Sequence, residues 1–368
     1  MKPQCTDLGE SHEGDPSGPT SVARAFFFDS PAAALMLLAP GGRSTAGDPL
    51  APGVPPPPAS SLPDDRERAW LTGCALGALG RFGAAAAVLR PLAETGDGPF
   101  ASLAWSTLAS HQRQIGRHAD ALVYDRRAER MIPTGSDPLS VTARFDAELG
   151  LAADAVGLGR TEDAVERLPG GELLSGAEAL PLPVGLEPRP DPVSAEWRRR
   201  VRRGWVATEI ALLRGDPADA VALAEAALTE AVVAGAPRHV AKCRLFLGAS
   251  RYVRYRDVSA APGVHRGVVD GGNARGGAER ILVEARSALT QAVAASATLG
   301  ALPLRWVAES LLADVLVLAD EPDAVVAEHR RSAATVVTAI GADLPVDQRS
   351  GWLSRPDLAA LLAAVPQT

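Results

Sequence analysis

The feature that most constrains this chain is a short turn that recurs along it. Four times, a stretch with helical character is expected to end at a glycine followed by an arginine or an aspartate: Gly80-Arg81, Gly116-Arg117, Gly159-Arg160 and Gly215-Asp216. An alanine follows each glycine five residues later: Ala85, Ala121, Ala164 and Ala220. Glycine readily adopts the left-handed backbone found at helix ends, and a small alanine lets the next helix cross close to the first. The pattern therefore predicts a series of helix hairpins.

The clearest copy spans residues 101–133, ASLAWSTLASHQRQIGRHADALVYDRRAERMIP. Its diagnostic residues are Trp105, Leu108 and Ala109 before the turn and Ala128 and Pro133 after it. This arrangement resembles the tetratricopeptide repeat, which has a Trp, a Leu, a small residue, two alanines and a Pro at these intervals. Ala109 replaces the usual glycine, and Asp125 stands where a large apolar side chain is commoner. The resemblance implies an α-α superhelix, a solenoid of stacked hairpins.

The distances between the turns predict where the repeat is interrupted. Successive turns are 36, 43 and 56 residues apart, whereas the repeat family has a period of about 34. The Pro- and Gly-rich stretch 170–193 lies in the longest interval and can account for its excess, so we expect an insertion there. Beyond Ala227 the pattern fades, and a second insertion is expected in the Gly-rich stretch 257–277. The array is expected to cover residues 63–364 in about six hairpins, with the C-terminal segment capping its end.

Composition supports an all-α fold. Hydrophobic residues make up 46% of the chain but aromatic residues only 4%, so Ala, Leu and Val provide most of the apolar mass. Alanine has the best helix propensity, and alternation with the period of a strand is scarce. Residues 1–62 differ, because Gly, Pro, Ser and Asp dominate and four prolines run from Pro55 to Pro58. We expect a disordered arm there, with at most a brief helix over 32–38.

Charge and cysteine content exclude several classes of protein. The net charge of −7 makes a general nucleic-acid binder unlikely, because such proteins neutralise phosphates. The three cysteines do not form a Cys-x-x-Cys pair, which favours reduced thiols and a cytoplasmic location. The apolar run 25–40 is broken by Asp29 and Pro31 and is too short to be a membrane anchor. The preference for Arg over Lys, together with abundant Ala and Gly, suggests an actinobacterial source.

The most strongly charged segment is 197–205, WRRRVRRGW, which has five arginines between two tryptophans. Such a segment could bind an acidic peptide, a phosphate or a nucleic acid. On a helix, however, these side chains point in several directions, so a solvated helix start is the alternative interpretation. The repeat alignment places only Arg202, Trp205 and Glu209 on the face that the family uses for ligands.

The same alignment predicts the other residues of a partner-binding groove. Across the array the candidates are Trp70, Ser106, Arg113, Arg202, Trp205 and Glu209, with Cys74 and Ser110 at neighbouring positions. Some family members hold the C-terminal carboxylate of chaperones with a set of Lys, Arg and Asn residues. That Lys and Asn set is missing here, which argues against this class of partner.

The sequence contains no signature of catalysis, a metal site or a cofactor site. The six histidines do not have metal-ligand spacing, and there is no His-Glu-x-x-His or Gly-x-Ser-x-Gly. The stretch 271–277 superficially resembles a phosphate loop but lacks the terminal Gly-Lys-Ser/Thr, so we interpret it as a flexible loop. Cys74 and Cys243 are expected to be buried thiols. No convergent polar set is apparent in the C-terminal third.

These observations predict a protein-interaction scaffold or adaptor. It would hold a protein or peptide partner in the concave groove of the solenoid, without catalysis, metal or cofactor. The alternative is a sensing protein of the same repeat type that controls transcription or signalling, although no helix-turn-helix is evident in 1–62 or after 345. An enzyme hidden in the C-terminal third is the third and least favoured possibility.

Overall fold

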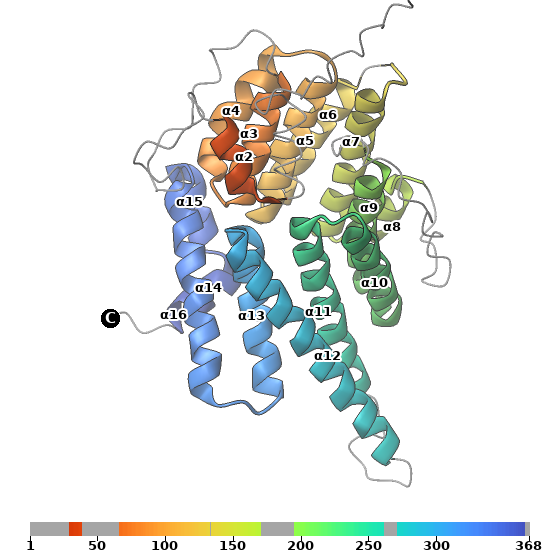
Figure 1. The fold of residues 1–368 in the computed structure, drawn as a ribbon, viewed down its shortest axis with the longest axis vertical. Coiled ribbons are helices and arrows are strands. Elements are labelled where there is room, and N and C mark those ends of the chain that lie inside the picture. Colours follow the sequence, from red (N-terminus) through yellow and green to blue (C-terminus); the bar gives the residue numbers. More distant parts are fainter. Residues whose placement is uncertain (1–28, 39–65, 133, 171–194, 261–270, 365–368) are drawn as a thin grey trace, which may run out of the picture.

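The computed structural model describes residues 29–38, 66–132, 134–170, 195–260 and 271–364. Within these ranges the protein is all-α, with fifteen helices and no strand (Figure 1). The first eight are α2 (Pro31–Leu38), α3 (Arg66–Ala78), α4 (Phe82–Thr95), α5 (Gly98–Gln114), α6 (His118–Arg130), α7 (Pro138–Gly157), α8 (Thr161–Arg167) and α9 (Glu196–Arg214). The others are α10 (Pro217–Val233), α11 (Pro237–Ala260), α12 (Gly271–Thr298), α13 (Leu302–Leu318), α14 (Asp323–Asp343), α15 (Val346–Leu353) and α16 (Pro356–Ala363).

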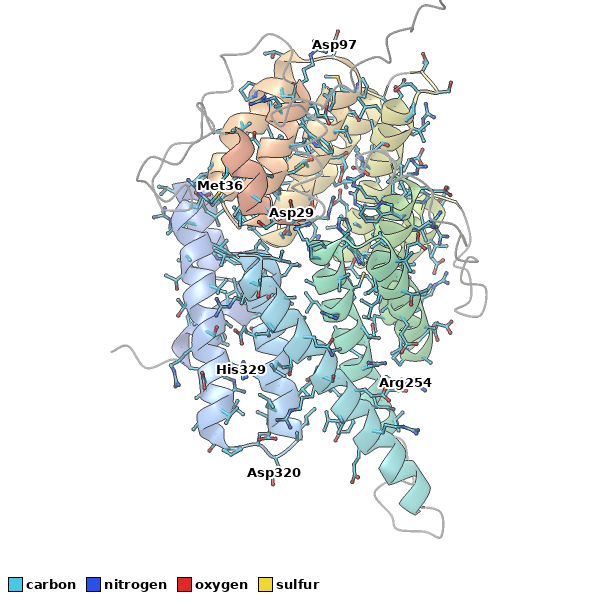
Figure 2. All side chains as sticks on the ribbon, viewed as in Figure 1. Asp29, Met36, Asp97, Arg254, Asp320 and His329 are labelled. Carbon is cyan, nitrogen blue, oxygen red and sulfur yellow. The ribbon has the colours of Figure 1, made fainter. Side chains whose placement is uncertain are left out.

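Twelve of these helices form six successive pairs, from α3–α4 to α13–α14. The first helix of each pair also packs against the first helix of the next, so α3, α5, α7, α9, α11 and α13 form one continuous row. The turn between α13 and α14, where Asp320 lies, is at the opposite end of the molecule from Asp97 (Figure 2). The expected stacking of about six hairpins is therefore present in the described part of the chain.

The glycine turns have the predicted backbone. Gly80, Gly116, Gly159 and Gly215 have φ between 69° and 80°, and the four alanines that follow them are fully buried. Left-handed glycines also precede α11 at Gly235 and α13 at Gly300, but these two lie between successive pairs and not inside a hairpin. The helices nevertheless continue to pack in pairs, as α11–α12 and α13–α14, where the sequence pattern had faded.

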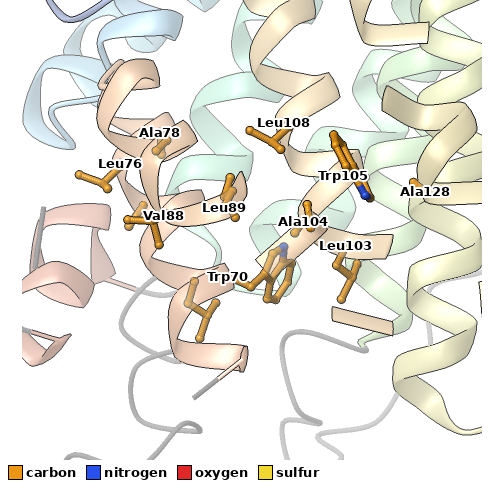
Figure 3. Close-up of a cluster of buried hydrophobic side chains, with 14 of the residues drawn as sticks. Trp70, Leu76, Ala78, Val88, Leu89, Leu103, Ala104, Trp105, Leu108 and Ala128 are labelled. Atoms are coloured by element: carbon orange, nitrogen blue, oxygen red, sulfur yellow. The ribbon is translucent and has the colours of Figure 1, made fainter. Parts of the chain in front are cut away.

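Close packing of small residues holds the first hairpins together. Trp70, Leu89, Leu103 and Trp105 belong to one buried cluster between α3, α4 and α5 (Figure 3). A Cβ placed on Gly73 would lie 2.3 Å from Cγ of Leu89. Only a glycine therefore allows the observed approach of α4 to α3.

The structure confirms one expectation about the irregular segments and corrects another. The brief helix expected in the N-terminal arm over 32–38 is present as α2, which packs on α3 and buries Ala34 and Leu35 in the first core cluster. The rest of that arm, and the insertion expected at 170–193 beyond Gly170, lie outside the described residues. The second insertion is shorter than 257–277, because α11 extends to Ala260 and α12 begins at Gly271. The stretch 271–277 is therefore the first two turns of a long helix and not a loop.

The two ends of the array contact each other. The Asp343 carboxylate, at the end of α14, accepts a hydrogen bond from the Gly83 amide at 2.6 Å, in the first turn of α4. Phe82 shares a buried cluster with Ile340 of α14 and Trp352 of α15. In Figure 1 the chain accordingly returns so that α14 and α15 lie near α4. The C-terminal helices therefore join the two ends of the array and do not cap a free end.

Candidate functional site

A cavity of about 540 Å³ lies along the row of first helices. Residues of α3, α5, α7, α9, α11 and α13 line it, together with His118 from α6. All six candidate groove residues are among them: Trp70, Ser106, Arg113, Arg202, Trp205 and Glu209. The structure thus brings together candidate side chains from three hairpins that are up to 139 positions apart in the sequence.

Trp70 and Ser106 form part of the cavity wall. The indole of Trp70 is 1% exposed and donates a hydrogen bond from Nε1 to Oγ1 of Thr107 at 2.9 Å. The Ser106 hydroxyl is buried and has no hydrogen-bond partner among the described residues. Ser106 therefore presents an unsatisfied polar atom, whereas Trp70 contributes mainly apolar surface.

Arg113 has a structural role that the sequence did not suggest. Its guanidinium forms ion pairs with Asp125 and, at 2.8 Å, with Asp154, and it also donates to the carbonyl oxygen of Gly150. Both carboxylates are fully buried. Burial raises the pKa of Asp125 well above its usual range, against the opposing effect of Arg113. At position 125 the resemblance predicts a large apolar side chain. The aspartate found there instead forms an ion pair with Arg113 at the interface of α5, α6 and α7.

The arginine segment is not a solvated helix start. Arg198 is 6% exposed and pairs with Asp146 of α7 at 3.0 Å, and Arg202 pairs with the other oxygen of that carboxylate. Burial alone would raise the pKa of Asp146, but the two guanidinium groups hold it below its ordinary value. One buried carboxylate therefore serves two arginines that line the cavity.

Trp205 is part of a stack of rings on α9 and α11. Its indole stacks on His239 at 5.3 Å and on Phe246 at 6.4 Å between ring centroids. The ammonium of Lys242 lies 4.1 Å from the centroid of the indole, a cation–π contact. Trp205 also donates from Nε1 to the Cys243 sulfur at 3.1 Å. The tryptophan is thus held rigidly beneath a basic side chain.

Glu209 faces basic residues that the sequence analysis missed. Burial raises the pKa of its carboxyl, while Lys242 and Arg113 act in the opposite direction. Burial, together with the charges of Arg238 and Arg202, lowers the pKa of Lys242 to about 8, against the opposing effect of Glu209. Arg238 and Lys242 lie on α11, one turn apart, where the repeat signature is too weak to assign groove positions.

Two histidines and a cysteine that line the cavity are poorly suited to proton transfer or nucleophilic attack. Burial, together with nearby arginines, lowers the pKa of His111 to about 3 and that of His239 well below its ordinary value. Burial raises the pKa of the Cys74 thiol to about 11. At neutral pH these histidines are therefore uncharged and this cysteine is protonated.

A convergent polar set does exist in the C-terminal third, contrary to expectation. The buried carboxylate of Glu309 on α13 contacts Nδ1 of His329 at 2.5 Å and accepts from the Ser332 hydroxyl at 2.7 Å. His329 and Ser332 both belong to α14, and Figure 2 places His329 midway along the hairpin. The Ser332 hydroxyl donates to Glu309 and accepts from the Arg305 guanidinium at 3.1 Å. These contacts join α13 to α14.

A second cavity, of about 640 Å³, lies between α6, α7 and α8 and contains none of the predicted residues. Within the described ranges, no three His, Cys, Asp or Glu side chains are close enough together to hold a metal ion. None of the helices in those ranges combines the length and apolar character needed to cross a bilayer. In comparisons of the sequence, no protein-family model and no curated protein matches this chain.

Proposed function

We propose that this protein is a binding scaffold of the tetratricopeptide type, which holds a peptide segment of a partner in the cavity along its first helices and performs no catalysis. The observation that carries the proposal is that six groove positions, chosen from the repeat alignment, line a single cavity. Its volume of about 540 Å³ is within the range of roughly 300–1,000 Å³ typical of ligand sites. Rigid aromatic side chains beside charged groups are the composition expected at the centre of a recognition site.

The most direct test fills the cavity and compares the result with a matched change elsewhere. Val307 lines the cavity on α13, whereas Val317, on the same helix, is 51% exposed and does not line it. Peptides selected from a displayed random library against the wild-type protein should bind Val317→Trp normally. They should lose binding to Val307→Trp, measured by fluorescence polarisation. Peptides that bind both variants equally would show that the cavity is not the site.

The contact between the ends of the array favours sensing as a second candidate function. The cavity is lined by α3 and α13, which belong to the first and last hairpins, and those hairpins meet at Asp343 and Gly83. A ligand that touches both would favour one arrangement of this contact, which is how binding becomes a signal. Saturation with a selected peptide should then change amide exchange at the start of α4. Unchanged exchange there would leave the simple scaffold as the better account.

A further inference from the structure

The part of the cavity formed by α9 and α11 carries more basic than acidic side chains. Asp146 is shared by Arg198 and Arg202, so Arg202 has only part of one counter-charge. Glu209 is the other carboxylate that lines this part, and burial raises its pKa. Positive charge in a partly buried site is costly unless an anion neutralises it.

Arg238 and Lys242 have the weakest neutralisation. Neither has a carboxylate of the described residues within ion-pair distance, and Nε of Arg238 is buried without a hydrogen-bond partner there. The ammonium of Lys242 lies over the aromatic faces of Trp205 and Phe246. Glu209 is the carboxylate whose charge acts on Lys242, but among the described residues the two do not form an ion pair. Two cations one helical turn apart thus face the cavity with donors still available.

Apolar side chains line the cavity next to these cations. Leu245 of α11 and Leu304, Trp306 and Val307 of α13 line it beside the basic residues. A ligand that fits this surface has a concentrated negative charge at one end and an apolar or aromatic body at the other. Two unpaired cations close together match one doubly charged group better than a single carboxylate.

We propose that Arg202, Arg238 and Lys242 form a binding site for a phosphate monoester dianion carried by the ligand of this cavity. The guanidinium groups would donate to the phosphate oxygens, Lys242 would supply a compact charge, and Trp205 would hold Lys242 in place. The proposal rests on the proposed function, since it specifies the chemistry of the ligand bound there. A free phosphate ester and a phosphorylated side chain share this chemistry.

The first experiment uses phenyl phosphate and phenyl sulfate, which have similar shapes but carry two charges and one. By isothermal titration calorimetry, the wild-type protein should bind the phosphate at least tenfold more tightly than the sulfate. Arg238→Met and Lys242→Met should each weaken phosphate binding by about tenfold or more, the usual effect of losing one charged hydrogen bond. Arg214→Met is the matched control, because Arg214 is on α9 but exposed and outside the cavity. Equal affinities for the two ligands, unchanged affinity in both α11 variants, or no saturable binding would overturn the proposal.

Thermal stability distinguishes a ligand-binding role of Arg238 from a structural role. If Arg238 is an unneutralised cation kept for a ligand, Arg238→Met should melt at or above the wild-type temperature while losing the ligand. A large fall in the melting temperature of the empty protein would overturn this assignment.

A second experiment separates the phosphate site from the peptide groove. Selected peptides are tested with and without a phosphotyrosine. Peptides that bind without phosphate and are blocked by Val307→Trp, combined with no binding of phenyl phosphate, would reject the phosphate site and retain the scaffold. Phenyl phosphate binding that depends on Arg238, with no peptide binding in either form, would support the site and reject the peptide function.

Discussion

Asp343 offers the sharpest test of the contact between the ends of the array. Helix α4 begins at Phe82. The residue at the N-cap position, Arg81, makes no side-chain capping hydrogen bond. Asp343 supplies the cap instead, accepting from the amides of Gly83 at 2.6 Å and Ala84 at 3.4 Å, 260 and 259 positions away in the sequence. Loss of a helix cap costs about 1 kcal/mol, and loss of a negative charge at a helix N-terminus about 0.3–1 kcal/mol. Asp343→Ala should therefore destabilise this contact by about 1–2 kcal/mol.

Hydrogen exchange followed by mass spectrometry measures this effect where it occurs. A loss of about 1–2 kcal/mol corresponds to roughly 5- to 30-fold faster exchange of amides in the first turns of α4, if they exchange by local opening. The global melting temperature should fall by only about 2 °C, because the entropy of unfolding of a chain this long is large. Asp343→Asn should lose less than Asp343→Ala, since it keeps an acceptor. Glu328→Ala, an exposed change on the same helix, is the control. Unchanged exchange of α4 in Asp343→Ala would refute the reasoning and indicate that the array is open.

Three further predictions concern other parts of the molecule. Gly116→Val should destabilise the protein by about 1–3 kcal/mol, because φ of Gly116 is +80° and a Cβ there would lie 2.9 Å from the Arg355 guanidinium. The control is Gly351→Val, because a Cβ at Gly351 has no neighbour within 4 Å; equal urea midpoints for the two variants would contradict the prediction. The pKa of Lys242 is lowered to about 8 in the folded protein, against about 10.4 in the unfolded chain. Between these two pH values the unfolded chain binds more protons, so the contribution of Lys242 to the free energy of unfolding rises with pH. The difference in unfolding free energy between wild type and Lys242→Met should therefore rise with pH in this window, and a difference that stays constant would reject the prediction. Burial raises the pKa of the Cys74 thiol to about 11 and that of the Cys243 thiol to about 12. Iodoacetamide at pH 8 should therefore label both cysteines only after unfolding, and rapid labelling of either cysteine in the folded protein would contradict the prediction.

The repeated turn was predictable because its causes are local. A glycine with φ between 69° and 80° and an alanine at the fourth position of the next helix are requirements that each of the first four hairpins meets within six residues. The same local spacing placed Trp70, Ser106, Arg113, Arg202, Trp205 and Glu209 on one side of the first helices, and those six residues do line a common cavity. Their role in binding a partner remains a prediction.

The basic character of the cavity could not be predicted in the same way. Arg238 and Lys242 lie on a helix whose repeat signature has faded, so no alignment assigned them to the groove. Arg113 was expected to be available to a partner, but Asp125 and Asp154 neutralise it. Ion pairs of this kind join residues on different helices, and only their positions in space decide which charges remain unpaired.

The sequence by itself determined the helical hairpins, the left-handed turns between them and the face that each first helix presents, because these depend on interactions over one or two helical turns. Only the tertiary structure decided that α2 joins the first core cluster, that Asp343 caps a helix 260 residues away, and that Arg238 and Lys242 of α11 line the cavity beside the arginines of α9. These features depend on contacts between helices that are far apart in the sequence. Such contacts depend on how whole helix faces pack together, and no short stretch of sequence specifies them.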